Sequence, residues 1–151
     1  KFSISCVEEL IKKFPDQIIG VKDSSYNLYE NLKIENFSVL PGSELKLLKG
    51  LELGCEGIIT ATCNVTASIS RKVYDDFRYK KQQTANQLLC NVRGVFDQFN
   101  LISGLHSFMS DQDIIYKNLL PPLSLLNKAD KKKLTEDLSK LNFSLGSLGV
   151  T

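Results

Sequence analysis

Three short apolar segments follow one another at equal spacing, and each ends in a polar or glycine-containing turn. They are Ile18–Lys22, Phe37–Leu40 and Gly57–Ala61. Short runs rich in β-branched and apolar residues are typical of buried strands. The turns lie 20 positions apart, from Lys22 to Gly42 and from Gly42 to Thr62. Repeated strand–helix units of this length predict parallel strands joined by right-handed crossovers, and therefore an α/β fold.

Helical patterns fill the intervals between these strands. Ser5 is placed to cap a helix that covers Val7–Phe14, before Pro15 and Asp16 break the pattern. Residues Tyr26–Ile34 predict a short, irregular helix. A further helix is expected to begin at the cap residue Ser43 and to end at Gly54.

The second half of the chain contains no convincing strand pattern. It predicts helices at Thr66–Arg78, Gln82–Phe99, Leu101–Met109 and Asp111–Tyr116, and a last amphipathic helix that begins at Asn127 or Asp130. The run of lysines at 131–133 lies on the polar side of that last helix, as a solvated face does. We therefore expect an all-helical second half.

Composition excludes several functional classes. The chain has 151 residues, of which 42% are hydrophobic and 24% charged, as in ordinary globular domains. A net charge of +2 gives no electrostatic reason to expect nucleic acid or an acidic membrane as a partner. No apolar stretch approaches the roughly 20 residues that a membrane-spanning helix needs. The first residues do not form a signal peptide, and no GxGxxG or Walker motif follows any of the three strands, which argues against a nucleotide-binding fold.

The four cysteines are scattered, no CxxC pair occurs, and His106 is the only histidine. Zinc sites need clustered nitrogen and sulfur ligands, so no metal site is expected. Free thiols in a reducing cytoplasm account for this pattern, and we expect a cytoplasmic protein. Cys63 lies near a strand end, but no histidine is close in sequence to activate it, and a small buried apolar role is the better interpretation.

Lys22 is the most informative single residue. Side chains alternate along a strand, so Ile18, Gly20 and Lys22 share one face. The carboxyl ends of buried parallel strands are where α/β enzymes keep their chemistry. Two interpretations stay open at this point: a strand-end lysine whose charge reaches solvent, or an amine kept neutral to attack a carbonyl.

The three strand ends together carry a resemblance. In their order and spacing, Gly20–Ser25, Leu40–Glu44 and Gly57–Val65 resemble the dihydrodipicolinate synthase / N-acetylneuraminate lyase family, as does the later segment Leu119–Leu123. The resemblance covers nearly the whole chain. It implies a (β/α)₈ TIM barrel, a fold of about 250 residues. We therefore expect this chain to be the C-terminal half of a longer enzyme.

The resemblance also implies a domain organisation. Residues 1–78 would contain the fifth helix and strands six to eight of the barrel, and residues 79–151 a helical C-terminal extension. The turn that binds the substrate carboxylate and the catalytic tyrosine of the family would both precede Lys1. The parent protein is expected to be a homo-oligomer, either a tetramer or a dimer.

The family forms a Schiff base between a lysine and pyruvate, and the matching lysine here is Lys22. A free lysine has a pKa of about 10.4, and burial lowers that pKa by disfavouring the ammonium. The neutral amine attacks the ketone of pyruvate or another 2-keto acid, and loss of water gives an imine. Proton loss gives an enamine that adds to an aldehyde, or the reverse sequence cleaves an aldol. The resemblance implies no cofactor, and it leaves open the aldehyde and the synthase or lyase direction.

The expected substrate-binding residues lie at the three strand ends. They are Ser24, Gly42, Ser43, Glu44, Thr60 and Ala61. Ser24 has an alternative role as a helix cap, and Glu44 has one as a carboxylate beside a helix N-terminus. Asn64 is expected to hold its loop. In related lyases, positions that match Ser24 and Glu44 bind substrate hydroxyls, which favours a hydroxylated substrate slightly.

Two rival functions remain. A non-catalytic α/β module could hold a small anion on the helix N-terminus after Gly42. A structural or regulatory fragment could have lost activity together with its N-terminal half. Lys22 discriminates against the first, since a binding module has no use for a neutral amine inside a barrel.

Overall fold

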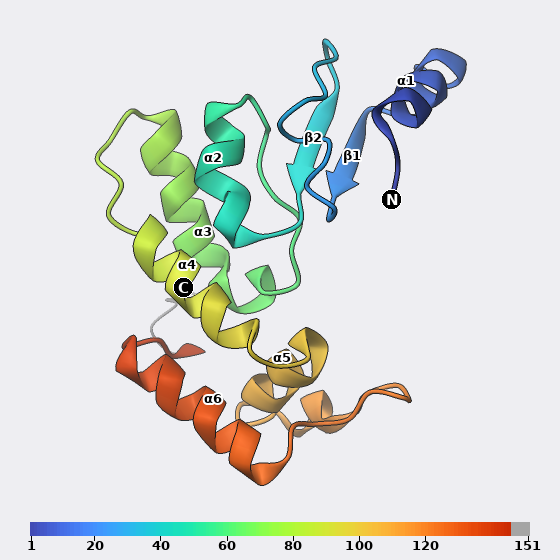
Figure 1. Cartoon of the computed structure of the whole chain (residues 1–151). Coiled ribbons are helices and arrows are strands. Elements are labelled where there is room, and N and C mark those ends of the chain that lie inside the picture. Colours follow the sequence, from blue (N-terminus) through green and yellow to red (C-terminus); the bar gives the residue numbers. More distant parts are fainter. Residues whose placement is uncertain (146–151) are drawn as a thin grey trace.

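The protein has an α/β part and an all-helical part, and the computed structural model describes residues 1–145 (Figure 1). Strand β1 (Gly20–Asp23) pairs with β2 (Ser38–Pro41) in parallel, in a register that runs from Gly20 opposite Ser38 to Asp23 opposite Pro41. The parallel pairing predicted from the equal spacing is confirmed. Both arrows in Figure 1 point toward the half of the molecule that contains helix α5 (Leu101–Met109).

The two faces of this small sheet differ in their surroundings. One face packs on an apolar cluster formed by Val7, Leu28, Tyr29, Leu32, Val39 and Cys55. The other face carries Lys22, which is exposed, and its register partner Leu40, which is half-buried. The expectation of a buried first strand is therefore wrong for the described chain. Ile19, just before the strand, is 70% exposed, because β1 has a strand neighbour on one edge only among residues 1–145.

Helix α1 (Ile4–Lys13) has its N-cap two residues earlier than its pattern predicted. Its cap is Ser3, whose hydroxyl accepts a hydrogen bond from the amide of Cys6 (3.2 Å). Ser5 lies inside the first turn and contacts the Ser3 hydroxyl instead (3.0 Å). The helix ends before Pro15, as expected.

The expected helix at Tyr26–Ile34 is wrong: the segment forms bends and a single turn, closed by Leu32 N and Leu28 O (2.7 Å). Tyr26 has a left-handed backbone with φ of 58°, which interrupts any continuous helix. The buried carboxylate of Asp23 accepts from the amides of Leu28 and Tyr29 (2.9 and 3.0 Å) and so organises this turn from outside.

The segment after β2 follows its local signals closely. Ser43 accepts from the amide of Leu45 and caps a 3₁₀ turn, η1 (Glu44–Lys46), which leads into α2 (Leu47–Glu52). Gly54 follows with φ of 92°, the left-handed conformation that ends many helices. The predicted cap and the predicted glycine are both confirmed.

The strand expected at residues 57–61 does not form. The segment is extended beside β2, and its one ladder contact is the hydrogen bond from Ile59 N to Pro41 O (3.1 Å). In a parallel ladder, the residue at position 41 would also donate its N–H to the segment at 57–61. Pro41 has no N–H, so this second hydrogen bond cannot form. Proline at the end of β2 therefore limits this pairing.

Helices build the rest of the described chain. They are α3 (Cys63–Arg78), α4 (Asn86–Phe96), α5, the 3₁₀ turn η2 (Ile114–Lys117) and α6 (Lys128–Lys140). Their existence is confirmed, although α4 is shorter than its pattern predicted and α3 starts earlier. Asn127 caps α6 by accepting from the amide of Asp130 (2.9 Å). Of the two predicted starting residues, Asn127 and Asp130, the first therefore starts the helix as its cap.

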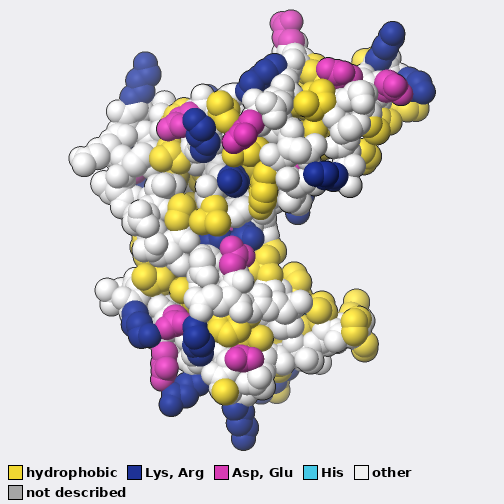
Figure 2. All heavy atoms as spheres, in the orientation of Figure 1, with side chains coloured by type: hydrophobic (Ala, Val, Ile, Leu, Met, Phe, Trp, Pro, Cys, Tyr) yellow, Lys and Arg dark blue, Asp and Glu magenta, His cyan; other side chains and the backbone are white. Residues whose placement is uncertain are grey.

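One apolar cluster holds this helical part together. Its buried members are Val65, Val92, Val95, Phe96, Leu105, Leu134, Leu138 and Phe143. They come from α3, α4, α5, α6 and the turn after α6, and Val65 in the first turn of α3 is the buried member from that helix. Further along α3, Val73 packs in a second cluster with Leu47, Leu51, Ala85 and Leu89. Figure 2 shows a wide recess on one side of the molecule, between the two parts.

Candidate functional site

The first element of the site is the end of β1. Lys22 is exposed, whereas Asp23, the next residue, is only 2% exposed. The Asp23 carboxylate accepts hydrogen bonds from the amides of Ser25 (3.1 Å), Leu28 (2.9 Å) and Tyr29 (3.0 Å). The backbone directly after Lys22 is therefore fixed by its neighbour.

The ends of β1 and β2 meet closely at Ser24 and Gly42. A Cβ atom at Gly42 would lie 2.6 Å from Ser24 Oγ and 3.2 Å from Ser24 Cα. The amide of Gly42 donates to the carbonyl of Asp23 (3.0 Å), which continues the ladder past the strand. The structure thus brings these two predicted residues together. No helix follows Ser24, so its alternative role as a helix cap is wrong, and its substrate role stays a prediction.

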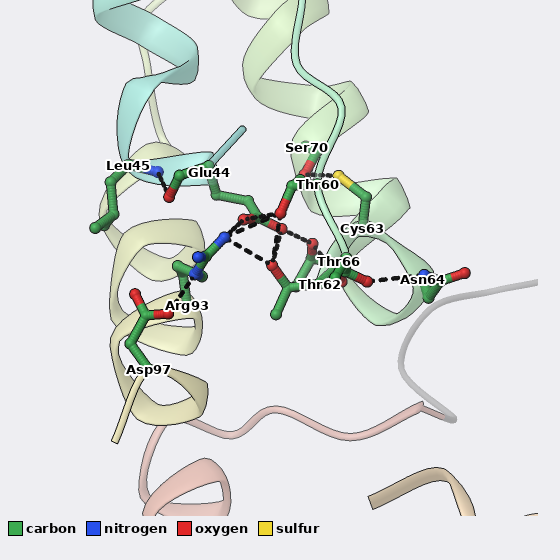
Figure 3. A network of polar contacts seen from close by, with 12 residues as sticks. Glu44, Leu45, Thr60, Thr62, Cys63, Asn64, Thr66, Ser70, Arg93 and Asp97 are labelled. Atoms are coloured by element: carbon green, nitrogen blue, oxygen red, sulfur yellow. Dashed lines mark hydrogen bonds and ion pairs between the residues drawn. The ribbon is translucent and has the colours of Figure 1, made fainter. Parts of the chain in front are cut away.

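Glu44 is fully buried at the centre of a polar cluster (Figure 3). Its Oε1 accepts from the hydroxyls of Thr62 and Thr66, the latter at 3.0 Å. Its Oε2 accepts from the hydroxyl of Thr60 (3.0 Å) and from Nη1 of Arg93 (2.8 Å). We refer to Glu44, Thr60, Thr62, Thr66 and Arg93 as the Glu44 cluster.

Arg93 reaches this cluster from the middle of α4. Its Nη1 also donates to Thr60 Oγ1 (2.9 Å) and Thr62 Oγ1 (3.3 Å). Its Nε donates to Asp97 Oδ1 (2.8 Å), one turn further along the helix. The planar guanidinium therefore holds two carboxylates at once, each through a different nitrogen.

The cluster sets the charge of both partners. Burial alone would raise the pKa of Glu44, but the hydrogen bonds from Thr62, Arg93 and Thr60 outweigh burial and lower that pKa below its ordinary value of 4.5. Burial alone would likewise lower the pKa of Arg93, and the contacts with Glu44 and Asp97 raise it instead. The structure thus holds Glu44 as a carboxylate and Arg93 as a cation.

The remaining predicted residues lie around the start of α3. Thr60 points its hydroxyl into the Glu44 cluster. Asn64 Nδ2 donates to the carbonyl of Ala61 (2.8 Å), which confirms that Asn64 holds its loop. Ala61 also lines a cavity of about 230 Å³ that includes His106 and Tyr116 from the helical part.

Sequence reasoning missed Arg93, Thr62 and Thr66. A signal for Arg93 was present: it lies beside Val92 and Phe96 in an apolar helical stripe, where a charged residue needs a buried partner. Its partner lies 49 positions away, so no local pattern could name it.

Two features are absent from residues 1–145. This part of the chain contains no group of three or more His, Cys, Asp or Glu side chains that could hold a metal ion. Nor does any helix within it have the length and apolar character needed to cross a bilayer.

Comparison with known proteins identifies the family. The family model described as the dihydrodipicolinate synthetase family matches residues 1–141. The chain belongs to this family. The resemblance that the three strand ends carry is thereby confirmed, and the non-catalytic anion-binding alternative is not favoured.

Individual relatives agree with this membership. An uncharacterized DapA-like lyase of Halobacterium salinarum is 25% identical over an alignment of 133 residues, and the alignment covers 83% of this chain and 44% of that protein. The 4-hydroxy-tetrahydrodipicolinate synthase of Methylacidiphilum fumariolicum SolV matches 93% of this chain and 49% of its own, with a TM-score of 0.81 and 18% identity. YagE of Escherichia coli K12, a prophage protein solved with pyruvate, matches 94% and 52%, with a TM-score of 0.78 and 22% identity.

The chain spans about half the length of the proteins it matches. The structural matches show the α/β fold of the family for this chain. Because only about half of each relative is covered, the numbering of the strands within a complete barrel stays a prediction.

Proposed function

We propose that this chain contributes Lys22 as the imine-forming residue of a pyruvate-dependent class I aldolase-type lyase or synthase. The observation that carries the proposal is the position of Lys22 at the carboxyl end of a parallel strand, in a chain that belongs to the dihydrodipicolinate synthetase family. One protein with the same fold, YagE, was solved in complex with pyruvate.

The chemistry needs an uncharged amine. Neutral Lys22 attacks the ketone carbon of pyruvate, and loss of water with uptake of a proton from a general acid gives a protonated imine. The positive nitrogen acidifies the neighbouring methyl group, and proton removal gives an enamine. The enamine carbon then forms a bond to an aldehyde, and hydrolysis releases the product and restores the amine. The lyase direction reverses these steps.

The exposure of Lys22 shapes this proposal. In a complete (β/α)₈ barrel the face that carries Lys22 and Leu40 is the barrel interior, where side chains of other strands would cover it. We infer that segments preceding this chain in the parent protein cover Lys22 and so remove it from water. The same segments would supply the proton-shuttling tyrosine and the carboxylate-binding turn. In this proposal residues 1–78 belong to the barrel and residues 79–151 to its helical extension, of which residues 146–151 lie outside the described part of the chain. The 151-residue chain alone is then expected to be inactive.

The substrates in this proposal are small molecules: pyruvate or another 2-keto acid, and an aldehyde. Ser24, Gly42, Ser43, Thr60 and Ala61 are proposed to form the mouth around the imine. The relatives include a named synthase and a protein named as a lyase, so both directions stay within the proposal.

Reductive trapping tests this proposal. The protein at its full natural length is incubated with pyruvate and borohydride, and the modified peptide is mapped by mass spectrometry. We expect one adduct, on Lys22. Lys22→Arg should trap nothing and turn over no substrate, because a guanidinium stays charged and forms no imine. The matched control is Lys49→Arg, on the exposed surface of α2, which should trap normally. An unmodified Lys22 or an adduct on another lysine would refute the assignment.

A further inference from the structure

A buried ion pair joins two segments of the chain that lie 49 positions apart, Glu44 after β2 and Arg93 on α4. Glu44 is 0% exposed and Arg93 is 8% exposed. Removing two charges from water is costly unless their remaining lone pairs and N–H groups are all satisfied. The imine chemistry of Lys22 uses neither residue, so this pair calls for a separate explanation.

The contacts of Glu44 leave no room for a further partner. A carboxylate offers about four lone-pair positions. Thr62 and Thr66 occupy those of Oε1, and Thr60 and Arg93 occupy those of Oε2. A substrate hydroxyl could therefore bind Glu44 only by displacing a protein donor. The geometry favours a role for Glu44 other than the substrate contact that the resemblance implies, and that contact itself stays a prediction.

The donors come from three separate segments. Thr60 lies at the end of the extended segment before α3 and Thr62 is the N-cap residue of α3, and their hydroxyls also contact each other (3.1 Å). Thr66 lies in the first turn of α3, where it donates to Glu44 and is within hydrogen-bond distance of the Thr62 carbonyl (3.0 Å). Arg93 is the only member from the helical extension. The cluster therefore ties α4 to the two chain segments that flank the proposed substrate mouth.

We propose that Arg93 is a positioning residue. Through Glu44 it fixes the chain after β2 against residues 60–62, and so sets the distance between Gly42 and Ala61 at the proposed mouth. The helical extension thus shapes the site without touching the substrate. This inference rests on the proposed function for its catalytic readout.

The first test is a double-mutant cycle. Glu44→Gln, Arg93→Met and the double variant are compared with the wild type by equilibrium unfolding of the full-length protein. Arg93→Met leaves a buried carboxylate without its cation and should raise the unfolding constant by roughly 150- to 5,000-fold. In the Glu44→Gln background the same change should cost at least tenfold less, because no buried charge is left unpaired. The control Arg71→Met breaks an exposed pair with Asp75 and should change the constant by less than about fivefold.

The second test separates positioning from plain stability. Kinetics are measured at a temperature at which every variant is fully folded. Arg93→Lys keeps a charge for Glu44 but loses the second arm to Asp97. We expect imine trapping on Lys22 to persist, while kcat/KM for the aldehyde falls about 100-fold in Arg93→Met and less in Arg93→Lys, since small misplacements cost about two orders of magnitude. Arg93→Lys also keeps the test decisive if Arg93→Met fails to fold.

The outcomes are distinguishable. If the wild type traps no pyruvate on Lys22, the proposed function fails, and the cycle alone still decides whether Glu44 and Arg93 are coupled. If folded Arg93→Met has wild-type kcat/KM, or if the cycle is additive, the positioning role is overturned. It is also overturned if Glu44→Gln selectively impairs hydroxylated aldehydes while Arg93→Met does not, because Glu44 would then contact the substrate directly.

Discussion

Gly42 is the position at which a single methyl group should do the most damage to the proposed site. An added Cβ would lie 2.6 Å from Ser24 Oγ, 3.3 Å from Ser24 Cβ and 3.2 Å from Ser24 Cα. The hydroxyl can rotate away, but the backbone of Ser24 cannot. Asp23 holds the backbone next to it through three amide hydrogen bonds, so the chain has little freedom to retreat.

The expected cost follows from two opposing terms. Overpacking of a tight contact costs about 1–3 kcal/mol. Replacing glycine by alanine also restricts the unfolded chain, which stabilises the fold by about 0.4–1 kcal/mol where the backbone is compatible. We therefore expect Gly42→Ala to destabilise the protein by about 1–2 kcal/mol, or roughly 5- to 30-fold in the unfolding constant.

Gly94 provides the matched control. It lies exposed inside α4, and a Cβ there would meet nothing within 4 Å. Gly94→Ala should therefore stabilise the protein by up to about 1 kcal/mol, as alanine does in a helix interior. The two variants add the same methyl group and should move stability in opposite directions.

The assay is equilibrium urea unfolding, combined with the rate of borohydride trapping on Lys22. Ser24→Gly should recover part of the loss in a Gly42→Ala background, since it removes the Oγ and Cβ atoms of Ser24 and leaves only the close approach to its backbone. If Gly42→Ala is as stable as Gly94→Ala, the close approach of the two strand ends is not a constraint, and the reasoning from this contact is refuted.

Two further predictions follow from buried carboxylates. Folding lowers the pKa of Glu44, so near the ordinary value of 4.5 the unfolded chain binds more protons than the folded chain. The ionised Glu44 side chain therefore contributes its full stabilisation above that pH, and this contribution is lost as the pH falls through the folded pKa. The stability of the wild type, measured by unfolding followed by circular dichroism, should therefore fall below about pH 4.5, and the stability of Glu44→Gln should fall less. Equal pH dependence of the two stabilities would contradict this. Asp23→Ala leaves the amides of Ser25, Leu28 and Tyr29 without their acceptor and should cost about 2–4 kcal/mol in urea unfolding. Wild-type stability would mean that water replaces the carboxylate.

Local signals in the sequence predicted those parts of the fold that local chemistry controls. Ser43 and Gly54 start and end a helical segment as predicted, and Asn127 is one of the two starting residues that the sequence left open for the last helix. The cap expected at Ser5 was wrong by two residues, since Ser3 takes that role. The equal spacing of the strands predicted the parallel pairing, which forms even though the connection between β1 and β2 contains no helix.

Where the sequence-based expectations failed, a competing contact decided the outcome. The amides at 28 and 29 bind the carboxylate of Asp23, and Tyr26 takes a left-handed backbone, so no helix forms at Tyr26–Ile34. Pro41 cannot donate the hydrogen bond that would extend the sheet to residues 57–61. The partner of Glu44 is Arg93 on a distant helix, and a single sequence contains no signal for that distance.

The orientation of Lys22 depends on Asp23 more than on Lys22 itself. Successive side chains in a strand point to opposite faces, so a shift of one residue would exchange the surroundings of the two. Asp23 is fixed in the covered face by three amide donors, and its own carbonyl accepts from the amide of Gly42. These contacts would be lost if the register shifted, because an exposed Asp23 could not reach the turn at residues 25–29. The buried carboxylate of Asp23 therefore fixes the strand register. This register directs Lys22 toward the open face on which the proposed chemistry takes place.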